Sequence, residues 1–569
     1  MTTSSPSFGT ILRIIHEATE FSRPTIGSPM TALKPADQRM PDLSLAGVEA
    51  RSARASELLE RLDRVDLDSV PHEIGLTLRL IRYYLDRVSG DAGRYWLAVD
   101  GLGIGYYGMF AWTAYNCGFL TNLIASHAQG FNFEKASDAD RYLGFISDIA
   151  VLIEQLDTRT RGQADRGIVM PRAQLEKAFP LLEGLRTMLG ERLRVVPDRL
   201  AGIDAPGFPE ELGRRIEILT GPVFAHAIET LETTSQGKAP EAVGLDQYPG
   251  GREVYDDLVR FHTTLDLSPE QIHDLGVDLM KRMRAEMAEI RAEAGFAGDD
   301  QAYLKSLRED PLWRAETAEG VSEFFQRYID RMKPVYDEYF DFECPVPYGV
   351  RALPDSLESG MTFGFYDMPR PDKLRGDYLF NAANLTQTQL SNVAALTYHE
   401  LVPGHHLHIS TQQQIENVHP LHNDAFFNAF NEGWGEYAAT LAGEAGMYRE
   451  PAERFGLLVM RAFLNCRLVV DTGMNALGWT LEDARTYLRE NSFLSEVEIE
   501  SETIRYSCDI PGQSLAYKLG DAEILRLREE TRARLGDAFD IRAFHRAVLQ
   551  HGGMPLPLLA WNIQQIFAD

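Results

Sequence analysis

The chain contains 569 residues, with 84 acidic and 56 basic side chains, and its formal net charge is −28. This length excludes a small disulfide-stapled scaffold, and the acidic balance excludes nucleic acid as a partner because phosphates would be repelled over most of the surface. The four cysteines contain no CxxC pair, so we expect them to be reduced. Neither a signal-peptide pattern nor a membrane-spanning run of about eighteen apolar residues occurs. These features predict a cytoplasmic protein that has no membrane partner.

Residues 8–240 show the apolar periodicity of helices. Apolar positions recur every three or four residues over four stretches, Leu58–Leu85, Arg141–Leu156, Arg172–Leu189 and Glu211–Leu231. A cluster of glycine and proline at Gly244–Gly251 then marks a seam between two regions. We therefore predict an N-terminal helical region, residues 1–243, and a second region, residues 244–569, which fold as one cooperative, lobed unit.

The second region opens with a helix that Ser268 and Gln271 cap and that runs towards Ala294. Between Cys344 and Asn384 the composition changes to proline, glycine and aromatic residues, which predicts a short antiparallel edge strand over Arg375–Asn381, with an irregular loop as the alternative. Helix is then predicted over five segments, Gln387–Glu400, Ala425–Glu444, Glu453–Leu477, Leu481–Asn491 and Gly520–Ala533. The pattern as a whole predicts a mainly α-helical protein.

Six of the fourteen histidines lie between residues 399 and 422. The first of them, His399, is followed by Glu400, and this pair opens a signature of zinc hydrolases. In that signature one helix supplies a histidine ligand, and the adjacent glutamate reaches the metal-bound water. The second histidine of the signature does not follow at i+4, because position 403 is proline.

This proline changes the expected path of the helix. In an uninterrupted helix His405 would be turned about 240° from His399, and His406 would lie about 10.5 Å further along the axis. Pro403 lacks the N–H that would bond the carbonyl of residue 399, and Gly404 tolerates conformations that other residues avoid. We therefore expect a kink or bulge that brings His405 into the place of the second ligand, with His406 as the alternative.

A catalytic zinc commonly takes a carboxylate beside two histidines and keeps its fourth position for water. The next amphipathic segment, Asn431-Glu-Gly-Trp-Gly-Glu-Tyr437, offers Glu432 as this third ligand. The two glycines of the segment would let its helix approach another backbone closely. Glu436, one turn later, is the second choice as a ligand or an outer partner that orients a ligating histidine.

The segment Ile504–Tyr517 combines an arginine and two tyrosines with a Pro-Gly turn. The guanidinium of Arg505 could hold the carboxylate of a substrate through paired hydrogen bonds. A hydroxyl group of Tyr506 or Tyr517 could stabilise an oxyanion. We therefore treat these three residues as candidates for substrate binding and catalysis.

With His399-Glu-Leu-Val-Pro-Gly-His-His406, Asn431–Tyr437 and the Arg505–Tyr517 segment in this order, the chain resembles a bacterial family known as domain of unknown function 885. That family is grouped with the glutamate-type zincin metallopeptidases, or gluzincins, whose helical relatives include angiotensin-converting enzyme and the oligopeptidases. The resemblance spans most of the chain. It implies a mainly α, two-lobed zincin-like fold with a deep central channel and a small antiparallel strand region before the metal-site helix.

The resemblance also implies roles for single residues. Zinc would be held by three side chains, His399, His405 and Glu432. Glu400 would be the general base, and Tyr506 or Tyr517 would lie near the oxyanion. At one position the chain departs from the family pattern, because Asn475 ends a segment that ends in histidine in the family, so we expect no acid role there.

The resulting hypothesis is a zinc-dependent hydrolase of short peptides or small amides, in which Glu400 takes a proton from water and returns it to the leaving amine. An extended substrate would pair with the edge of the strand predicted over Arg375–Asn381. Two alternatives remain at this point. The protein could hydrolyse a non-peptide amide or ester, or it could be a non-catalytic metal-binding or scaffold protein whose zinc takes a fourth protein ligand such as His406.

Overall fold

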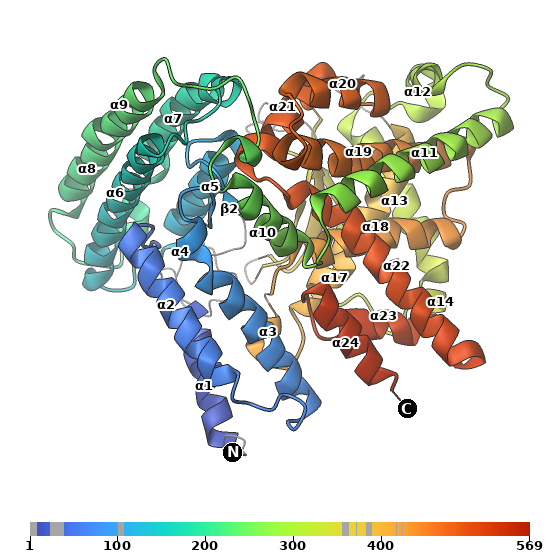
Figure 1. The fold of residues 1–569 in the computed structure, drawn as a ribbon, viewed down its shortest axis with the longest axis horizontal. Helices are drawn as coiled ribbons and strands as arrows, with labels where there is room; N and C mark the ends of the chain where they lie inside the picture. The colour runs from blue at the N-terminus through green and yellow to red at the C-terminus, as the bar shows by residue number, and fades with distance from the viewer. Residues whose placement is uncertain are drawn as a thin grey trace. The chain divides into compact units, whose positions relative to one another are not determined.

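The computed structural model of the chain is mainly α-helical, which confirms the predicted fold class at this level (Figure 1). It describes residues 8–22, 39–100, 107–354, 364–370, 373–382, 390–416, 418–423 and 425–568. Within these ranges, no helix combines the length and the apolar composition that crossing a membrane requires. The chain divides into two compact units, which are described separately.

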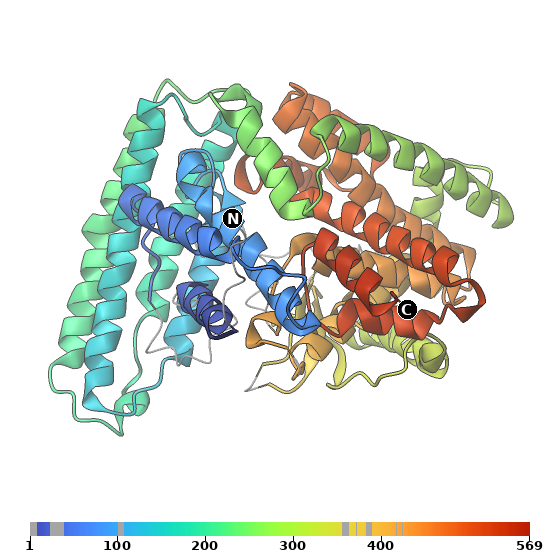
Figure 2. The same ribbon diagram turned by 60° about the horizontal axis from the view of Figure 1, so that its bottom comes forward.

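Unit 1 consists of Met1–Leu258, Met474–Leu481 and Ile504–Pro511. Its helices are α1 (Phe8–Ser22), α2 (Leu45–Leu62), α3 (His72–Ser89), α4 (Asp91–Arg94), α5 (Ala114–Gly130), α6 (Ala136–Asp165), α7 (Arg172–Arg192), α8 (Phe208–Ile218), α9 (Phe224–Ser235) and the greater part of α10 (Gly251–Thr263). Strands β1 (Val99–Asp100) and β2 (Tyr107–Gly108) form an antiparallel pair. Both ribbon views show α6, α7, α8 and α9 packed side by side (Figures 1 and 2).

Two of the helices predicted for this region are interrupted. The stretch Leu58–Leu85 is not continuous, because α2 and α3 are separated by a loop that ends at Pro71. The stretch Glu211–Leu231 is divided between α8 and α9 by a π-helical turn, Leu219–Val223, which contains Pro222. In both places a proline lacks the N–H that a continuous helix would need, so the apolar periodicity alone overestimates helix length.

Unit 2 consists of Val259–Gly473, Glu482–Thr503 and Gly512–Asp569. Its complete helices are α11 (Pro269–Glu293), α12 (Asp300–Glu309), α13 (Ala318–Met332), α14 (Tyr336–Tyr339), α16 (Val393–Glu400), α17 (His405–Gln412), α18 (Asn428–Glu444), α22 (Ala516–Leu535), α23 (Ile541–Leu549) and α24 (Leu556–Ile566), and it also contains most of α19 (Pro451–Ala476), α20 (Leu481–Asn491) and α21 (Glu496–Ile504). The predicted capping box is present, because Ser268 and Gln271 exchange both hydrogen bonds at the start of α11. Of the helix predicted over Gln387–Glu400, residues 387–389 lie outside the described residues.

Helix α18 lies at the centre of the packing in unit 2. It contacts α16, α17 and α22, and most of its side chains, including Trp434 and Tyr437, are buried. Its closest neighbour is α22, because a Cβ atom added to Gly433 would lie only 2.5 Å from the backbone of Gly520. The predicted close approach of two backbones therefore occurs at Gly433. This packing fixes the helix that carries Glu432.

A small sheet precedes the histidine-bearing helices. Its strands β3 (Tyr348–Ala352), β4 (Phe365–Asp367) and β5 (Gly376–Phe380) have the order β3-β5-β4. Strand β5 pairs parallel with β3 and antiparallel with β4. The prediction of an antiparallel edge strand over Arg375–Asn381 is therefore wrong in two respects, since the sheet is mixed and β5 is its central strand. Both hydrogen-bonding edges of β5 are occupied within the protein, so a substrate backbone cannot add to it.

Candidate metal centre

Three predicted ligands come together in unit 2. His399 lies in the last turn of α16, His405 is the first residue of α17, and Glu432 lies in α18. One nitrogen or oxygen atom from each side chain can be chosen so that the three atoms lie within 4.8 Å of one another. Within the described ranges, this is the group of histidine, cysteine and carboxylate side chains whose geometry suits a metal ion.

The sequence between the two histidines produces the predicted break. Helix α16 ends at Glu400, and the backbone turns through Val402–Pro403, which has a cis peptide bond, before α17 begins. A Cβ atom on Gly404 would collide with the carbonyl groups of the last turn of α16, so only glycine fits there. The indole Nε1 of Trp434 donates a hydrogen bond of 2.9 Å to the carbonyl of Pro403 and ties this turn to α18.

The distances within the cluster suit a tetrahedral ion. The Nε2 atoms of His399 and His405 lie 3.7 Å and 3.3 Å from Oε2 of Glu432. Ligands held about 2.0–2.2 Å from zinc at tetrahedral angles lie about 3.3–3.6 Å from one another. Two imidazole nitrogens and one carboxylate oxygen are also a ligand set of catalytic zinc sites, so the residues present fit this ion.

The other ring nitrogen of His399 has a separate partner. Its Nδ1 lies 2.9 Å from Oε1 of Glu436, which is buried behind the imidazole on the next turn of α18. Glu436 therefore occupies the position of an outer partner that orients His399 and leaves Nε2 directed at Glu432. A Cβ atom on Gly435 would lie 2.8 Å from Cε1 of His399, so this glycine makes room for the imidazole ring.

The electrostatics of the cluster favour a cation. Burial alone would lower the pKa of His399, but its hydrogen bonds with Glu432 and Glu436 raise that pKa well above its usual value. Burial would raise the pKa of Glu432, yet the two imidazoles hold that pKa well below its usual range. Without an ion, the two carboxylates thus attract a proton to the imidazole, and a metal ion would take the place of that proton.

Glu400 is placed beside the cluster without being part of it. Burial raises the pKa of its carboxyl group, while the nearby His405 and His399 oppose that shift. In the described part of the chain, its carboxylate has no hydrogen-bond or ion-pair partner. A carboxylate with a raised pKa and free oxygens can accept a proton from a neighbouring water molecule.

His406 is bound elsewhere. Its Nε2 lies 2.8 Å from the carbonyl of Val346, and its Nδ1 lies 2.7 Å from the hydroxyl group of Tyr366. Because a carbonyl only accepts, Nε2 carries the hydrogen and Nδ1 accepts from the tyrosine. Burial lowers the pKa of His406 to about 4, which keeps the ring neutral. Both nitrogens are therefore engaged, so the structure brings His405 to the cluster and directs His406 to the sheet.

The candidates from the Arg505–Tyr517 segment fall into different units. Arg505 and Tyr506 belong to unit 1, where the guanidinium lies 6.0 Å from the tyrosine ring and the Tyr506 carbonyl accepts from Asn475. Tyr517 belongs to unit 2, and the guanidinium of Arg467 lies 4.7 Å from its ring. The roles of Arg505, Tyr506 and Tyr517 stay predictions.

Sequence reasoning missed one buried cation near the cluster. Lys518 in α22 is 8% exposed and forms an ion pair with Asp521. Its positive charge, together with that of Arg461, helps the hydrogen bond from His399 to lower the pKa of Glu436 against the effect of burial. The i, i+3 spacing of Lys518 and Asp521 is visible in the sequence, but it does not show that the pair is buried.

The chain is similar to known proteins over nearly its whole length. The family described as bacterial protein of unknown function, DUF885, matches residues 25–563. Among curated proteins there is no match. The solved structure of a candidate lipoprotein from Colwellia psychrerythraea is 23% identical, with a TM-score of 0.81 over 98% of this chain and 98% of that one.

A second solved structure, a candidate lipoprotein of unknown function from Shewanella oneidensis, is 18% identical, with a TM-score of 0.76 over 99% of this chain and 100% of that one. At these identities the two structures share the fold and carry no statement about activity. The match to the family, in contrast, includes the histidine cluster, Asn431–Tyr437 and the Arg505–Tyr517 segment. The chain therefore belongs to the bacterial DUF885 family.

Proposed function

We propose that the protein is a zinc-dependent hydrolase that cleaves short peptides by activating water. The observation that carries the proposal is the convergence of His399, His405 and Glu432 to within 4.8 Å beside the free carboxylate of Glu400. A structural zinc site is normally closed by four protein ligands, whereas three ligands leave a position for water. The three-ligand set beside a candidate base therefore supports catalysis.

Each side chain of the site has a separate role in the proposed reaction. Zinc, when bound by the three ligands, would supply a Lewis acid that polarises the scissile carbonyl and lowers the pKa of water. The carboxylate of Glu400 accepts the proton from water and returns it to the leaving amine. Glu436 holds His399 in the orientation that directs Nε2 to the cluster. Tyr506 or Tyr517 and Arg505 remain candidates for the oxyanion and for a substrate carboxylate.

Assignment to the glutamate-type zincins rests on this arrangement together with the sequence resemblance. A His-Glu pair at the end of one helix, a second histidine after a turn and a glutamate on a later buried helix support it. The preference for short peptides is carried over from the helical oligopeptidases that the chain resembles. The non-catalytic alternative has less support, since both nitrogens of His406 are engaged and the ring cannot close the site.

Elemental analysis tests the ligands. We expect about one zinc per chain in the purified wild type and in His406→Ala, and loss of zinc in His399→Ala, His405→Ala and Glu432→Ala. His406→Ala is the matched control because it removes an adjacent histidine from the same helix. If zinc is neither present nor taken up when it is added, the metal centre and the hydrolase assignment are both refuted.

Glu400→Gln tests the base. We expect retained zinc with cleavage of peptides reduced at least about a hundredfold, as removal of a general base commonly produces. A library of short peptides and small amides and esters defines the substrate class, and activity confined to amides or esters outside the peptide class would select the non-peptide alternative. Undiminished turnover in Glu400→Gln would remove this residue from the mechanism.

The predicted cytoplasmic location stays part of this proposal. The two solved neighbours are candidate lipoproteins, which makes the location worth measuring directly. Fractionation of cells that produce the natural protein, followed by detection with a specific antibody, decides between the cytoplasm and the membrane fraction.

A further inference from the structure

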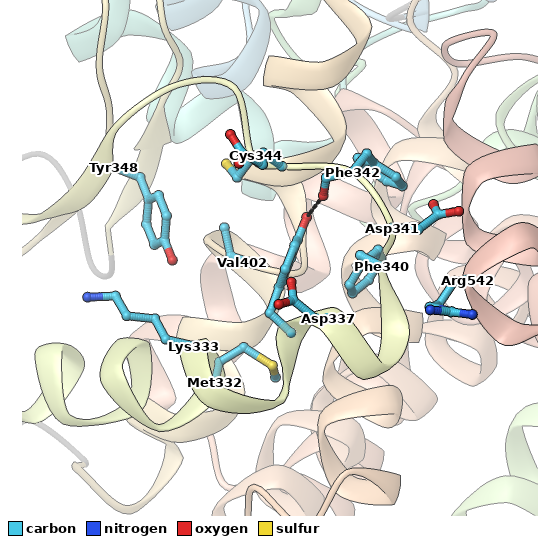
Figure 3. Close-up of a pocket in the computed structure, with 12 residues that line it drawn as sticks. Met332, Lys333, Asp337, Phe340, Asp341, Phe342, Cys344, Tyr348, Val402 and Arg542 are labelled. Carbon is cyan, nitrogen blue, oxygen red and sulfur yellow. Dashed lines mark hydrogen bonds between the residues drawn. The ribbon is translucent and has the colours of Figure 1, made fainter.

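A pocket of about 540 Å³ lies in unit 2, on the loop that joins the two candidate zinc-binding histidines (Figure 3). Its wall runs from the end of α13 through α14 to β3 and includes Val402 of that loop. Figure 3 shows the carboxylate of Asp337 and the side chain of Val402 in the middle of the lining residues, with Tyr348 on one side and Arg542 on the other. The volume is sufficient for a ligand the size of an amino-acid derivative.

Four aromatic rings line the pocket, Tyr336, Phe340, Phe342 and Tyr348. The rings of Tyr336 and Phe340 are stacked with centroids 4.9 Å apart, and Phe342 meets Phe340 edge to face at 5.8 Å. The hydroxyl group of Tyr336 donates a hydrogen bond to the carbonyl of Phe342, and this bond restrains the ring of Tyr336. Such a wall binds apolar groups, and the faces of the rings attract cations.

Five charged side chains also line the pocket, and three of them are matched by partners outside it. These pairs are Lys333 with Asp330 at 2.8 Å, Arg542 with Asp540 at 2.9 Å and Asp341 with Arg546 at 2.7 Å. The remaining two, Asp337 and Glu343, have no ion-pair or hydrogen-bond partner in the part of the chain that the structure describes. The charges in the pocket that have no partner are therefore the two negative ones, while the cationic side chains of Lys333 and Arg542 are paired with carboxylates outside it.

We propose that this pocket binds a ligand that carries a guanidinium or ammonium group on an apolar stem, as the side chains of arginine and lysine do. The carboxylates of Asp337 and Glu343 would accept hydrogen bonds from the cationic group. The rings of Tyr336 and Tyr348 would cover its apolar stem and add cation–π attraction. This site is separate from the metal centre and does not depend on the proposed hydrolase function.

The position of the pocket also links its occupant to the metal centre. Val402 lies between Glu400 and His405 in the chain, is largely buried and lines the pocket. On a second path, Phe340 packs on Trp434 with ring centroids 6.5 Å apart, and that indole holds the carbonyl of Pro403. An occupant of the pocket would therefore contact Val402, which lies in the turn between the two histidines.

Equilibrium dialysis of the full-length protein tests the site. The probe is N-acetyl-L-arginine amide, whose intact concentration is measured by mass spectrometry, and the neutral control of nearly the same shape is N-acetyl-L-citrulline amide. We expect saturable binding of the arginine probe, weakened at least about tenfold in the citrulline analogue because the charge-assisted bonds are lost. Binding should also weaken as salt is raised.

Variants locate the bound probe. We expect Asp337→Asn and Glu343→Gln to weaken binding of the arginine probe at least about tenfold. Glu338→Gln is the matched control, since this neighbouring glutamate is exposed and does not line the pocket. All three positions have exposed side chains, so melting temperatures should stay close to that of the wild type.

Four results would overturn the proposal. The first is no binding of the arginine probe at about 10 mM, a concentration roughly tenfold above the largest dissociation constant expected for such a site. The second is equal binding of the citrulline analogue. The other two are binding by Asp337→Asn equal to that of the wild type, and a loss of binding in Glu338→Gln equal to that in Asp337→Asn. Repeating the titration with Glu432→Ala keeps the two proposals apart. Binding that is lost in this variant but unaffected by Asp337→Asn would place the probe at the metal centre instead.

Discussion

The partner of His399 provides the most direct test of the geometry of the metal centre. Glu436 is 2% exposed, and its carboxylate lies 2.9 Å from Nδ1 of His399. The carboxylate fixes the tautomer in which Nδ1 carries the hydrogen, and it increases the basicity of the Nε2 atom that would bind the ion. Glu436→Gln keeps a hydrogen-bond acceptor of the same shape but removes its charge. Glu436→Ala removes the orienting bond as well.

The expected loss of zinc affinity follows from the loss of the negative charge and from the loss of the orienting hydrogen bond. Removal of an outer carboxylate partner commonly weakens metal binding by about 10- to 100-fold, or about 1.4–2.7 kcal/mol. We place Glu436→Gln near the lower end, because His399 keeps its orientation. We place Glu436→Ala near the upper end, because the imidazole can then rotate in the space that the carboxylate leaves. The measured quantity is the zinc dissociation constant, obtained by competition with a chromophoric chelator.

The control for this experiment lies two turns along the same helix. Glu444 is 44% exposed and pairs with Arg528, so Glu444→Gln changes the charge of α18 by the same amount without touching His399. We expect its zinc affinity to stay within about twofold of the wild type. Unchanged affinity in a folded Glu436→Ala protein would refute the orienting role. An equal loss in Glu444→Gln would show that the effect comes from the charge of the helix rather than from the contact.

Two further predictions use other contacts of unit 2. Gly435→Ala should weaken zinc binding at least about tenfold because its Cβ would meet the ring of His399 at 2.8 Å, whereas Gly443→Ala, whose Cβ would meet only Tyr448 at 3.5 Å, should not. Burial lowers the pKa of His545 from 6.5 to about 4, so the unfolded chain takes up this proton first, and its contribution to stability is lost as the pH falls from 6.5 towards 4. We expect the free energy of unfolding in urea to fall between pH 7.0 and 5.5 by about 1 kcal/mol less in His545→Phe than in the wild type. An equal fall in the two proteins would contradict the lowered pKa.

Local features of the sequence predicted the break between the two histidines. The missing N–H of Pro403 and the need for glycine at position 404 are properties of the backbone at those residues, and they act whatever packs around them. The structure accordingly ends one helix at Glu400 and begins the next at His405. The same local geometry predicted that His405, rather than His406, is the second candidate ligand.

Contacts between distant parts of the chain could not be predicted in this way. The partners that engage His406 are Tyr366 and Val346, which precede it by 40 and 60 residues. The central place of β5 depends in the same way on its register with β3, which no local pattern specifies. His406 and strand β5 are therefore both engaged by partners that only the tertiary fold brings close.

The positions of Glu432 and Glu436 explain two of the three glycines in the helix that carries them, Gly433 and Gly435. Both glutamates lie on the same face of α18, one turn apart, and the nitrogen of His399 that each approaches separates a candidate ligand from an orienting partner. Glycine lowers intrinsic helix stability by about 1 kcal/mol relative to alanine. A side chain at Gly433 would nevertheless meet the backbone of Gly520, and one at Gly435 would meet the ring of His399. Helix α18 is thus less stable in isolation than an alanine-containing helix would be, and this is the condition under which both carboxylates reach the same imidazole.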